Sequence, residues 1–388
     1  MSEKRTDKTK EGEKRRPVRS FLSFAVLLAA VLLVVLFAAY RDGTGFDILR
    51  RYLHYGRPEQ VGGEAVYHYD ASSKNRFALL GEYLVVLSDT SLRLFDGAGE
   101  EVWSAQVTMA SPALATGGGR AVAYDVGGTA LYVLDQAGPV LALTADEEEP
   151  YLSATLNKNG ELAVTAQARG YKGGVRTYDQ GPDPAFVFKS SRRFVLDGYV
   201  MGNDLAVVTL GQENGVFVSS IGLYDLSRDA EEPAASYDVS GGLVVSIGEK
   251  DGRIATVSDT ALTFASTGGE ITGSYSYKGA YLRAYDLGGT GVSTLLLNRY
   301  RSGSGGRLVT VGRDGEELAS LDVREEVLSV SASGRYLAVL YADRLAVYNQ
   351  DLQLYATLQG TGGVREALMR PDGTVLLVSA SSASLFLP

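Results

Sequence analysis

The chain of 388 residues contains no cysteine and only two histidines, His54 and His68. Without cysteine the chain cannot form a disulfide, a thiolate zinc site, an iron–sulfur cluster or a cysteine nucleophile. Two histidines supply little material for a histidine-based metal site or a Ser-His-Asp triad. We therefore predict no metal site, no cofactor and no catalytic residue, and we regard an enzymatic function as open but disfavoured.

Proline is also scarce, with 10 residues, whereas the chain has 46 glycines that fall mostly in turn-like positions. Few prolines and a hydrophobic content of 45% are typical of a globular protein and not of a disordered one. The formal net charge is −9 at pH 7 although the N-terminus is basic, so the rest of the chain is strongly acidic. An acidic domain is a poor partner for nucleic acid, and we expect no nucleic-acid binding.

One long apolar run stands near the N-terminus, at residues 21–40. As a helix, 20 uncharged residues span about 30 Å, the thickness of the hydrocarbon core of a bilayer. The run predicts a single transmembrane helix over residues 20–41, with the lipid bilayer as a partner of residues 21–40. The alternative is a cleaved signal peptide, whose apolar core is usually shorter, about 7–15 residues.

Charges on either side of this run predict its orientation. The leader, residues 1–19, is rich in lysine and arginine, which the positive-inside rule places in the cytoplasm. The predicted localisation is therefore the cell membrane, single-pass, with the large C-terminal part extracytoplasmic. Residues 42–63 read as a juxtamembrane helix and linker, because Phe46, Leu49 and Leu53 share one helical face.

The remaining residues, 64–388, repeat one pattern of short apolar runs separated by tight turns. The stretches YLVVLSDTSLRLFDGAGEEVWSAQV, from Tyr83, and AVAYDVGGTALYVLDQAGPVLALTA, from Ala121, show it most clearly. The mean step between copies is about 42 residues, the length of a four-stranded propeller blade. Eight copies start near residues 83, 121, 161, 204, 253, 291, 335 and 374.

The runs are apolar on both faces, as in LVVL (84–87), which suits sheets that are covered on both sides by neighbouring blades. The eighth copy ends after its third strand, and an unpaired run, EAVYHYD (64–70), precedes the first copy. This run can supply the missing strand and close the ring, which removes exposed edges. The predicted fold is an all-β, eight-bladed β-propeller, with seven blades as the alternative.

The segment Leu92–Val107 resembles the repeat of quinoprotein-like propellers, including the outer-membrane assembly lipoprotein of that fold. In those repeats an Asp, a Gly and a Trp mark the turn and the outer strand, and Asp96, Gly99 and Trp103 match them here. The whole layout also resembles an uncharacterised family of Gram-positive membrane-anchored propellers. The resemblance implies a fold and a location, and it carries no activity.

Three connections between second and third strands are unusually long, at residues 166–174, 210–220 and 297–307. Long loops on a rigid scaffold are where recognition concentrates. Two of them mix bases with aromatic residues, a combination that suits anionic or glycan ligands through bidentate contacts and stacking. The candidate ligand-binding residues are Arg169, Tyr171, Lys172, Arg299, Tyr300 and Arg301. The alternative is that these are solvated hairpin tips without a ligand.

Three functions remain compatible with the sequence. The leading hypothesis is a membrane-anchored extracytoplasmic propeller that serves as a binding or scaffold module for an envelope protein or an anionic or glycan polymer. The alternatives are a glycan-processing enzyme of sialidase-like type and a structural assembly factor that pairs a strand edge with its clients. No Asp-box, WD signature or phosphate-binding loop is visible, and GGGR at residues 117–120 reads as a hairpin turn.

Overall fold

A computed structural model describes residues 26–34 and 66–388, except positions 180, 229–231 and 240. Residues 26–34 form one helix, and none of the described helices is long and apolar enough to cross a membrane. The predicted span (20–41) extends beyond the described residues on both sides, and the juxtamembrane segment (42–63) lies outside them.

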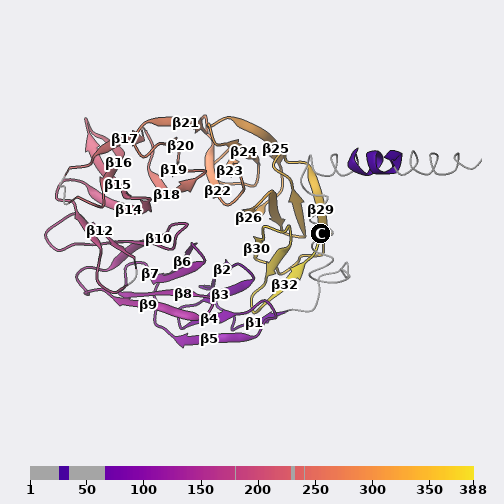
Figure 1. The fold of residues 1–388 in the computed structure, drawn as a ribbon, viewed down its shortest axis with the longest axis horizontal. Helices are drawn as coiled ribbons and strands as arrows, with labels where there is room; N and C mark the ends of the chain where they lie inside the picture. Colours follow the sequence, from indigo (N-terminus) through magenta and orange to yellow (C-terminus); the bar gives the residue numbers. More distant parts are fainter. Residues whose placement is uncertain (1–25, 35–65, 180, 229–231, 240) are drawn as a thin grey trace, which may run out of the picture. The chain divides into compact units, whose positions relative to one another are not determined.

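The described part of residues 66–388 forms eight four-stranded antiparallel sheets arranged as blades around a centre (Figure 1). Blade 1 consists of β2 (Arg76–Leu80), β3 (Tyr83–Leu87), β4 (Ser91–Phe95) and β5 (Glu101–Gln106). Blade 2 consists of β6 (Pro112–Gly117), β7 (Arg120–Asp125), β8 (Ala130–Asp135) and β9 (Gly138–Thr144). Blade 3 consists of β10 (Tyr151–Leu156), β11 (Leu162–Ala166), β12 (Gly174–Tyr178) and β13 (Phe186–Lys189). Blade 4 consists of β14 (Phe194–Met201), β15 (Asp204–Glu213), β16 (Val216–Asp225) and β17 (Ala235–Val239).

The second half of the ring repeats this arrangement. Blade 5 consists of β18 (Val244–Lys250), β19 (Arg253–Ser258), β20 (Ala261–Ala265) and β21 (Ile271–Ser276). Blade 6 consists of β22 (Tyr281–Asp286), β23 (Val292–Asn298), β24 (Gly306–Gly312) and β25 (Glu317–Val323). Blade 7 consists of β26 (Val327–Ser333), β27 (Tyr336–Tyr341), β28 (Arg344–Tyr348) and β29 (Leu354–Gln359). Blade 8 consists of β30 (Glu366–Met369), β31 (Val375–Val378), β32 (Ser382–Phe386) and β1 (Tyr67–His68). The prediction of an eight-bladed all-β propeller is confirmed, and the seven-bladed alternative is wrong.

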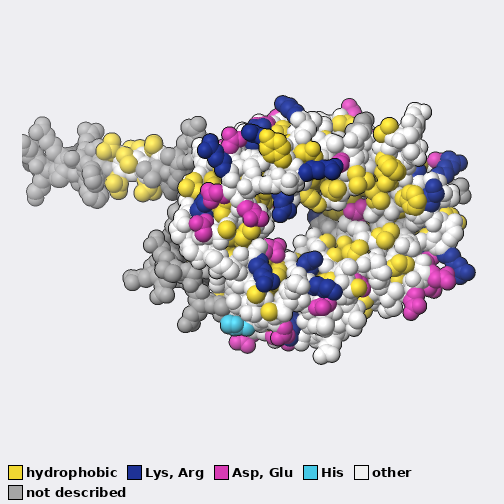
Figure 2. Space-filling model, turned by 180° about the vertical axis from the view of Figure 1, so that it is seen from behind, with side chains coloured by type: hydrophobic (Ala, Val, Ile, Leu, Met, Phe, Trp, Pro, Cys, Tyr) yellow, Lys and Arg dark blue, Asp and Glu magenta, His cyan; other side chains and the backbone are white. Residues whose placement is uncertain are grey.

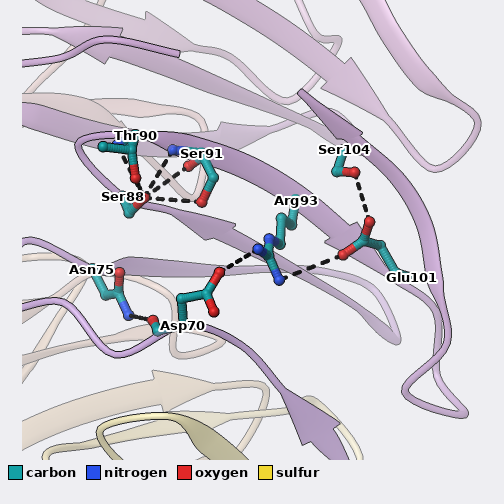
Figure 3. Close-up of polar contacts among 8 residues, drawn as sticks. All are labelled: Asp70, Asn75, Ser88, Thr90, Ser91, Arg93, Glu101 and Ser104. Carbon is teal, nitrogen blue, oxygen red and sulfur yellow. Dashed lines mark hydrogen bonds and ion pairs between the residues drawn. The ribbon is translucent and has the colours of Figure 1, made fainter. Parts of the chain in front are cut away.

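The N-terminal strand β1 completes the last blade. It pairs antiparallel with β32, with Tyr67 opposite Ala383 and His68 opposite Ser382 (Figure 1). The sequence predicts this strand over residues 64–70, whereas the strand itself covers two residues and positions 64 and 65 lie outside the described chain. Asp70, just after β1, forms an ion pair with Arg93 of β4, so the closing segment is also tied to blade 1 (Figure 3).

Hydrophobic clusters hold the blades together. Eight clusters of buried side chains each lie between two adjacent blades, and one of them joins blade 8 to blade 1. The second strands are buried on both faces, as in β3 and β23. Stacking in a circle therefore explains why these strands are apolar throughout instead of alternating.

The repeat has a constant register. At or next to the end of each third strand, one residue pairs with the start of the second strand, as Phe95 does with Leu84 and Tyr348 with Leu337. An Asp or Asn then begins the outer turn in several copies. The Oδ1 of Asp96 accepts hydrogen bonds from the backbone N–H groups of Ala98 (2.9 Å) and Glu100 (3.0 Å). These acids are turn residues, as their position predicted.

One predicted loop is wrong. Residues 210–220 lie in the two longest strands of the ring's described part, because β15 and β16 stay paired as far as Glu213 and Val216. Asn214 (φ +50°) and Gly215 (φ +83°) form the turn. Asn-Gly is a strong hairpin signal, so the sequence did contain the clue to this extension.

The glycines at the turn between β6 and β7 provide a test of blade stacking. Gly118 and Gly119 both have positive φ, but a Cβ at Gly118 would overlap the backbone of Gly160 in blade 3, whereas a Cβ at Gly119 would meet open space. Gly118→Ala should therefore lower the free energy of unfolding by about 1–3 kcal/mol more than Gly119→Ala does, because the clash adds to the same backbone strain. Urea denaturation of the two variants checks this, and equal losses would contradict the stacking of blades 2 and 3.

Asp197 predicts a pH dependence of stability. It lies in β14, the innermost strand of blade 4, where burial raises the pKa of its carboxyl to about 6. Hydrogen bonds from the Ser153 hydroxyl and the Gly198 N–H lower the pKa, but by less than burial raises it. The folded state therefore holds this proton more tightly than the unfolded state, and this group's contribution to stability is lost as pH rises from about 4 to about 6. Asp197→Asn should raise the midpoint of thermal unfolding at pH 7 and flatten its pH dependence in this window. A lower midpoint for the variant at pH 7 would contradict the assignment.

Candidate functional site

The antiparallel order gives the ring two distinct faces. The connections between second and third strands and those between successive blades lie at one end, which we call the loop face. The hairpins between first and second strands and between third and fourth strands lie at the other end, the turn face. A hollow is open at the centre of the ring, with charged side chains near it (Figure 2). Because β1 runs antiparallel to β32, Val66 joins the propeller at the turn face.

The three candidate residues of blade 3 lie in the loop between β11 and β12, on the loop face. Arg169 Nη1 lies 3.1 Å from Glu148 Oε2, and the Lys172 ammonium lies over the Phe194 ring, 5.0 Å from its centroid. Tyr171 is half exposed and has the Lys189 ammonium over its ring. Both cationic side chains of this set therefore already have partners within the protein.

The three candidate residues of blade 6 lie in the loop between β23 and β24, on the same face but three blades away. This loop has no regular secondary structure, and the Arg299 N–H donates to the Gly305 carbonyl at 3.1 Å. Tyr300 is 67% exposed, and the Arg301 guanidinium lies over Tyr281, 5.8 Å from the ring centroid. In the part of the chain that the structure describes, neither Arg299 nor Arg301 forms an ion pair with a carboxylate.

Arg301 lines a cavity of about 430 Å³ between blades 6 and 7. A second arginine, Arg283, lines the same cavity and comes from the innermost strand β22. A register shift places Leu282 opposite Leu297 and Ala284 opposite Leu296, so Arg283 is the extra residue of a β-bulge. We call this the anion cavity, and its lining is completed by Leu296, Asn298, Gly303, Ser304, Glu326 and Val327.

Arg283 is not among the candidate residues that the sequence pattern indicates. The strand YLRAYD is apolar apart from this arginine and its terminal aspartate, so a charged residue inside an inner strand was the available signal. The bulge that exposes the side chain is a property of pairing with β23, and no local pattern reveals it. Bulges are frequent beside functional sites because they re-aim one side chain.

The geometry of the anion cavity suits an anionic group. Two guanidiniums without ion-pair partners among the described residues converge on it, and guanidiniums bind carboxylate and phosphate in a planar, bidentate manner. Asn298 is buried and its Nδ2 donates to the Gly303 carbonyl at 3.2 Å, which fixes the base of the loop. Glu326 is exposed at the rim and is the one carboxylate in the described lining.

The fold defines the class of protein, an eight-bladed β-propeller, and solved structures of similar fold support it. BamB from Moraxella catarrhalis superimposes with a TM-score of 0.52 at 13% identity, over 83% of this chain and 99% of that one. Quinohemoprotein alcohol dehydrogenase ADHIIG from Pseudomonas putida HK5 gives 0.53 at 11% identity, over 82% and 72%. Dihydro-heme d1 dehydrogenase NirN gives 0.51 at 14% identity, over 79% and 76%. At such identities these similarities establish the fold alone.

The chain belongs to a family of unknown function, DUF5711, whose model matches residues 63–351. The match begins just before β1 and ends within blade 7, so it covers most of the propeller. No curated protein matches the chain in sequence.

Proposed function

We propose that this protein is a membrane-tethered, extracytoplasmic binding or scaffold module whose loop face captures an envelope protein or polymer through an anionic group. The observation that carries the proposal is the pair of guanidiniums, Arg283 and Arg301, on one cavity with no ion-pair partner among the described residues. Isolated surface arginines are ordinary, but here one from β22 and one from the loop between β23 and β24 share a cavity. Two such guanidiniums form a site for a carboxylate or a phosphate.

The tether and the location are part of the proposal. They are supported by the uncharged run at residues 21–40 and by the basic leader that precedes it. Leu28→Arg with Leu32→Arg should move the protein from the membrane to the soluble fraction, because each arginine at the centre of a span costs about 2.5–3.5 kcal/mol. Release of the native protein by an alkaline wash would contradict the tether. Resistance of the propeller to protease added outside intact cells would contradict the location.

Partner capture tests the site. The full-length protein is cross-linked in its native cell, and the adducts are compared with those of a variant in which Arg299, Tyr300 and Arg301 are changed to alanine. Capture should fall at least tenfold with no change in thermal stability, because these side chains are exposed. The matched control changes Arg169, Tyr171 and Lys172 to alanine. These residues lie on the same face but do not line the anion cavity, and Arg169 already pairs with a carboxylate, so capture should persist. Equal loss in both variants, or no loss in the first, would overturn the assignment to blade 6.

A further inference from the structure

A second cavity opens on the loop face where blades 7, 8 and 1 meet. Its volume is about 270 Å³, near the lower end of the range of about 300–1,000 Å³ typical of small-molecule sites. None of its lining residues lines the anion cavity, although the two are neighbours: Val327 at the start of β26 borders one, and Leu328 and Ser329 border the other. Its lining also includes Asn75, Phe77, Arg365, Glu366 and Ala380.

The amide of Asn75 leaves one acceptor unfilled. Its Nδ2 donates to the Asp70 carbonyl at 2.9 Å, which directs Oδ1 away from Asp70 (Figure 3). Oδ1 is buried and has no hydrogen-bond donor among the described residues. A buried acceptor without a donor is unfavourable, so a ligand hydroxyl that donates here removes that cost.

Glu366, the first residue of β30, supplies the second acceptor. Its carboxylate accepts no hydrogen bond from any described residue, and burial raises its pKa while the Arg76 guanidinium lowers it. The charged groups around it are Arg76 at the start of β2 and Arg365 just before β30, both exposed, and blade 7 contributes only Leu328 and Ser329. Ser329 Oγ accepts from the Ala367 N–H at 2.9 Å, so its own hydrogen is free to donate.

These groups select among ligand classes. A cation would meet the carboxylate of Glu366 but also the guanidinium of Arg365 in the lining, with that of Arg76 acting on Glu366 from outside it. An anion would meet the partly buried carboxylate. A neutral molecule with several hydroxyl groups can donate to Glu366 and Asn75 and accept from Arg365 and Ser329. Phe77 and Leu328 add apolar surface against which a ring with C–H groups packs.

We propose that this second cavity is a saccharide subsite, in which Asn75 and Glu366 accept hydrogen bonds from sugar hydroxyls and Phe77 covers one face of the ring. The subsite goes beyond the proposed function, because it rests on residues that take no part in the anion cavity. A glycan that also carries acidic groups would fill both cavities at once, on either side of the start of β26.

Calorimetry and saturation-transfer NMR on the purified full-length protein test the subsite with three neutral probes, cellobiose, maltose and N,N′-diacetylchitobiose. At least one should bind, and its affinity should fall at least tenfold in Glu366→Gln and in Asn75→Leu. Ala380→Trp, which fills the cavity from the rim, should abolish binding; each variant is first checked for an unchanged thermal midpoint. Arg301→Ala should bind the probe as the native protein does, while losing the binding of inorganic phosphate that the proposed function predicts.

The outcomes separate the two hypotheses. Absence of binding for all three saccharides overturns the subsite, and so does binding that survives Glu366→Gln and Ala380→Trp together. Ethylenediamine, which is positively charged at neutral pH, serves as a cationic probe. If it binds and none of the sugars does, the subsite is overturned and the cavity is a cation site. Saccharide binding without phosphate binding supports the subsite and contradicts the anion cavity.

Discussion

Tyr67→Ala should lower the free energy of unfolding by about 3–5 kcal/mol, the usual cost of removing a buried aromatic ring. The Tyr67 side chain is 1% exposed and lies in the cluster between blades 8 and 1. Its ring meets Phe95 edge-on with centroids 6.2 Å apart, and its hydroxyl receives a hydrogen bond from Arg370 Nη2 at 3.3 Å. Because β1 has only two residues, Tyr67 provides much of the apolar contact that keeps the closing strand in place.

The neighbouring residue offers the matched control for this prediction. His68 lies on the same two-residue strand, but its side chain is exposed, so His68→Ala should change the free energy of unfolding by less than about 0.5 kcal/mol. Denaturant titration followed by tyrosine and tryptophan fluorescence measures both variants. If the two substitutions cost the same, the closing strand does not hold the ring together.

The second large effect is expected at the anion cavity. Arg283→Ala combined with Arg301→Ala should weaken binding of an acidic ligand by at least about 100-fold, since each hydrogen-bonded charge contributes at least about 1.5 kcal/mol and tenfold corresponds to 1.4 kcal/mol. The affinity of the captured partner for the purified protein is measured by calorimetry at two salt concentrations. The affinity of the native protein should fall more steeply with salt than that of the double variant, because salt screens charge pairs at exposed sites.

Conservative substitutions refine this test. Arg283→Lys keeps the charge but lacks the planar guanidinium that forms two parallel hydrogen bonds. It should therefore recover only part of the affinity that Arg283→Ala loses. The single alanine variants should not add up to the double variant, because both side chains bind one group in one cavity. Full recovery with lysine would indicate general charge attraction in place of a defined site. Additive losses would place the two arginines at separate sites.

Much of the fold follows from the sequence because each blade repeats the same physical constraints. Strands buried on both faces must be apolar throughout, and Asp or Asn starts the tight outer turn in several blades. The period of about 42 residues can therefore be recognised in the sequence. The truncated eighth copy and the unpaired run before the first copy together predict closure. The structure places Tyr67–His68 beside β32, in keeping with that pattern.

The candidate site follows from the sequence only in part. The loops that carry Arg169 and Arg301 are long and charged, and both features are local, so the sequence reveals them. Whether an arginine already has a partner depends on contacts between segments, such as Glu148 beside Arg169. The register between β22 and β23 makes Arg283 a bulge residue, and no local pattern records that register. Asn75 and Glu366 line one cavity although they lie far apart in the chain, which no local pattern records either.

Closure of the ring is the central structural claim, since the second cavity exists only if blade 8 packs on blade 1. The chain has no cysteine, so His68→Cys with Ser382→Cys introduces the sole thiol pair, at positions that face each other across β1 and β32. Mild oxidation of the folded full-length protein should form this disulfide within one chain and raise the denaturation midpoint. The control pair, His68→Cys with Ser104→Cys on the outer strand of blade 1, should stay reduced. A missing cross-link in the first pair, or a cross-link only between chains, would contradict a ring closed by its own N-terminal strand.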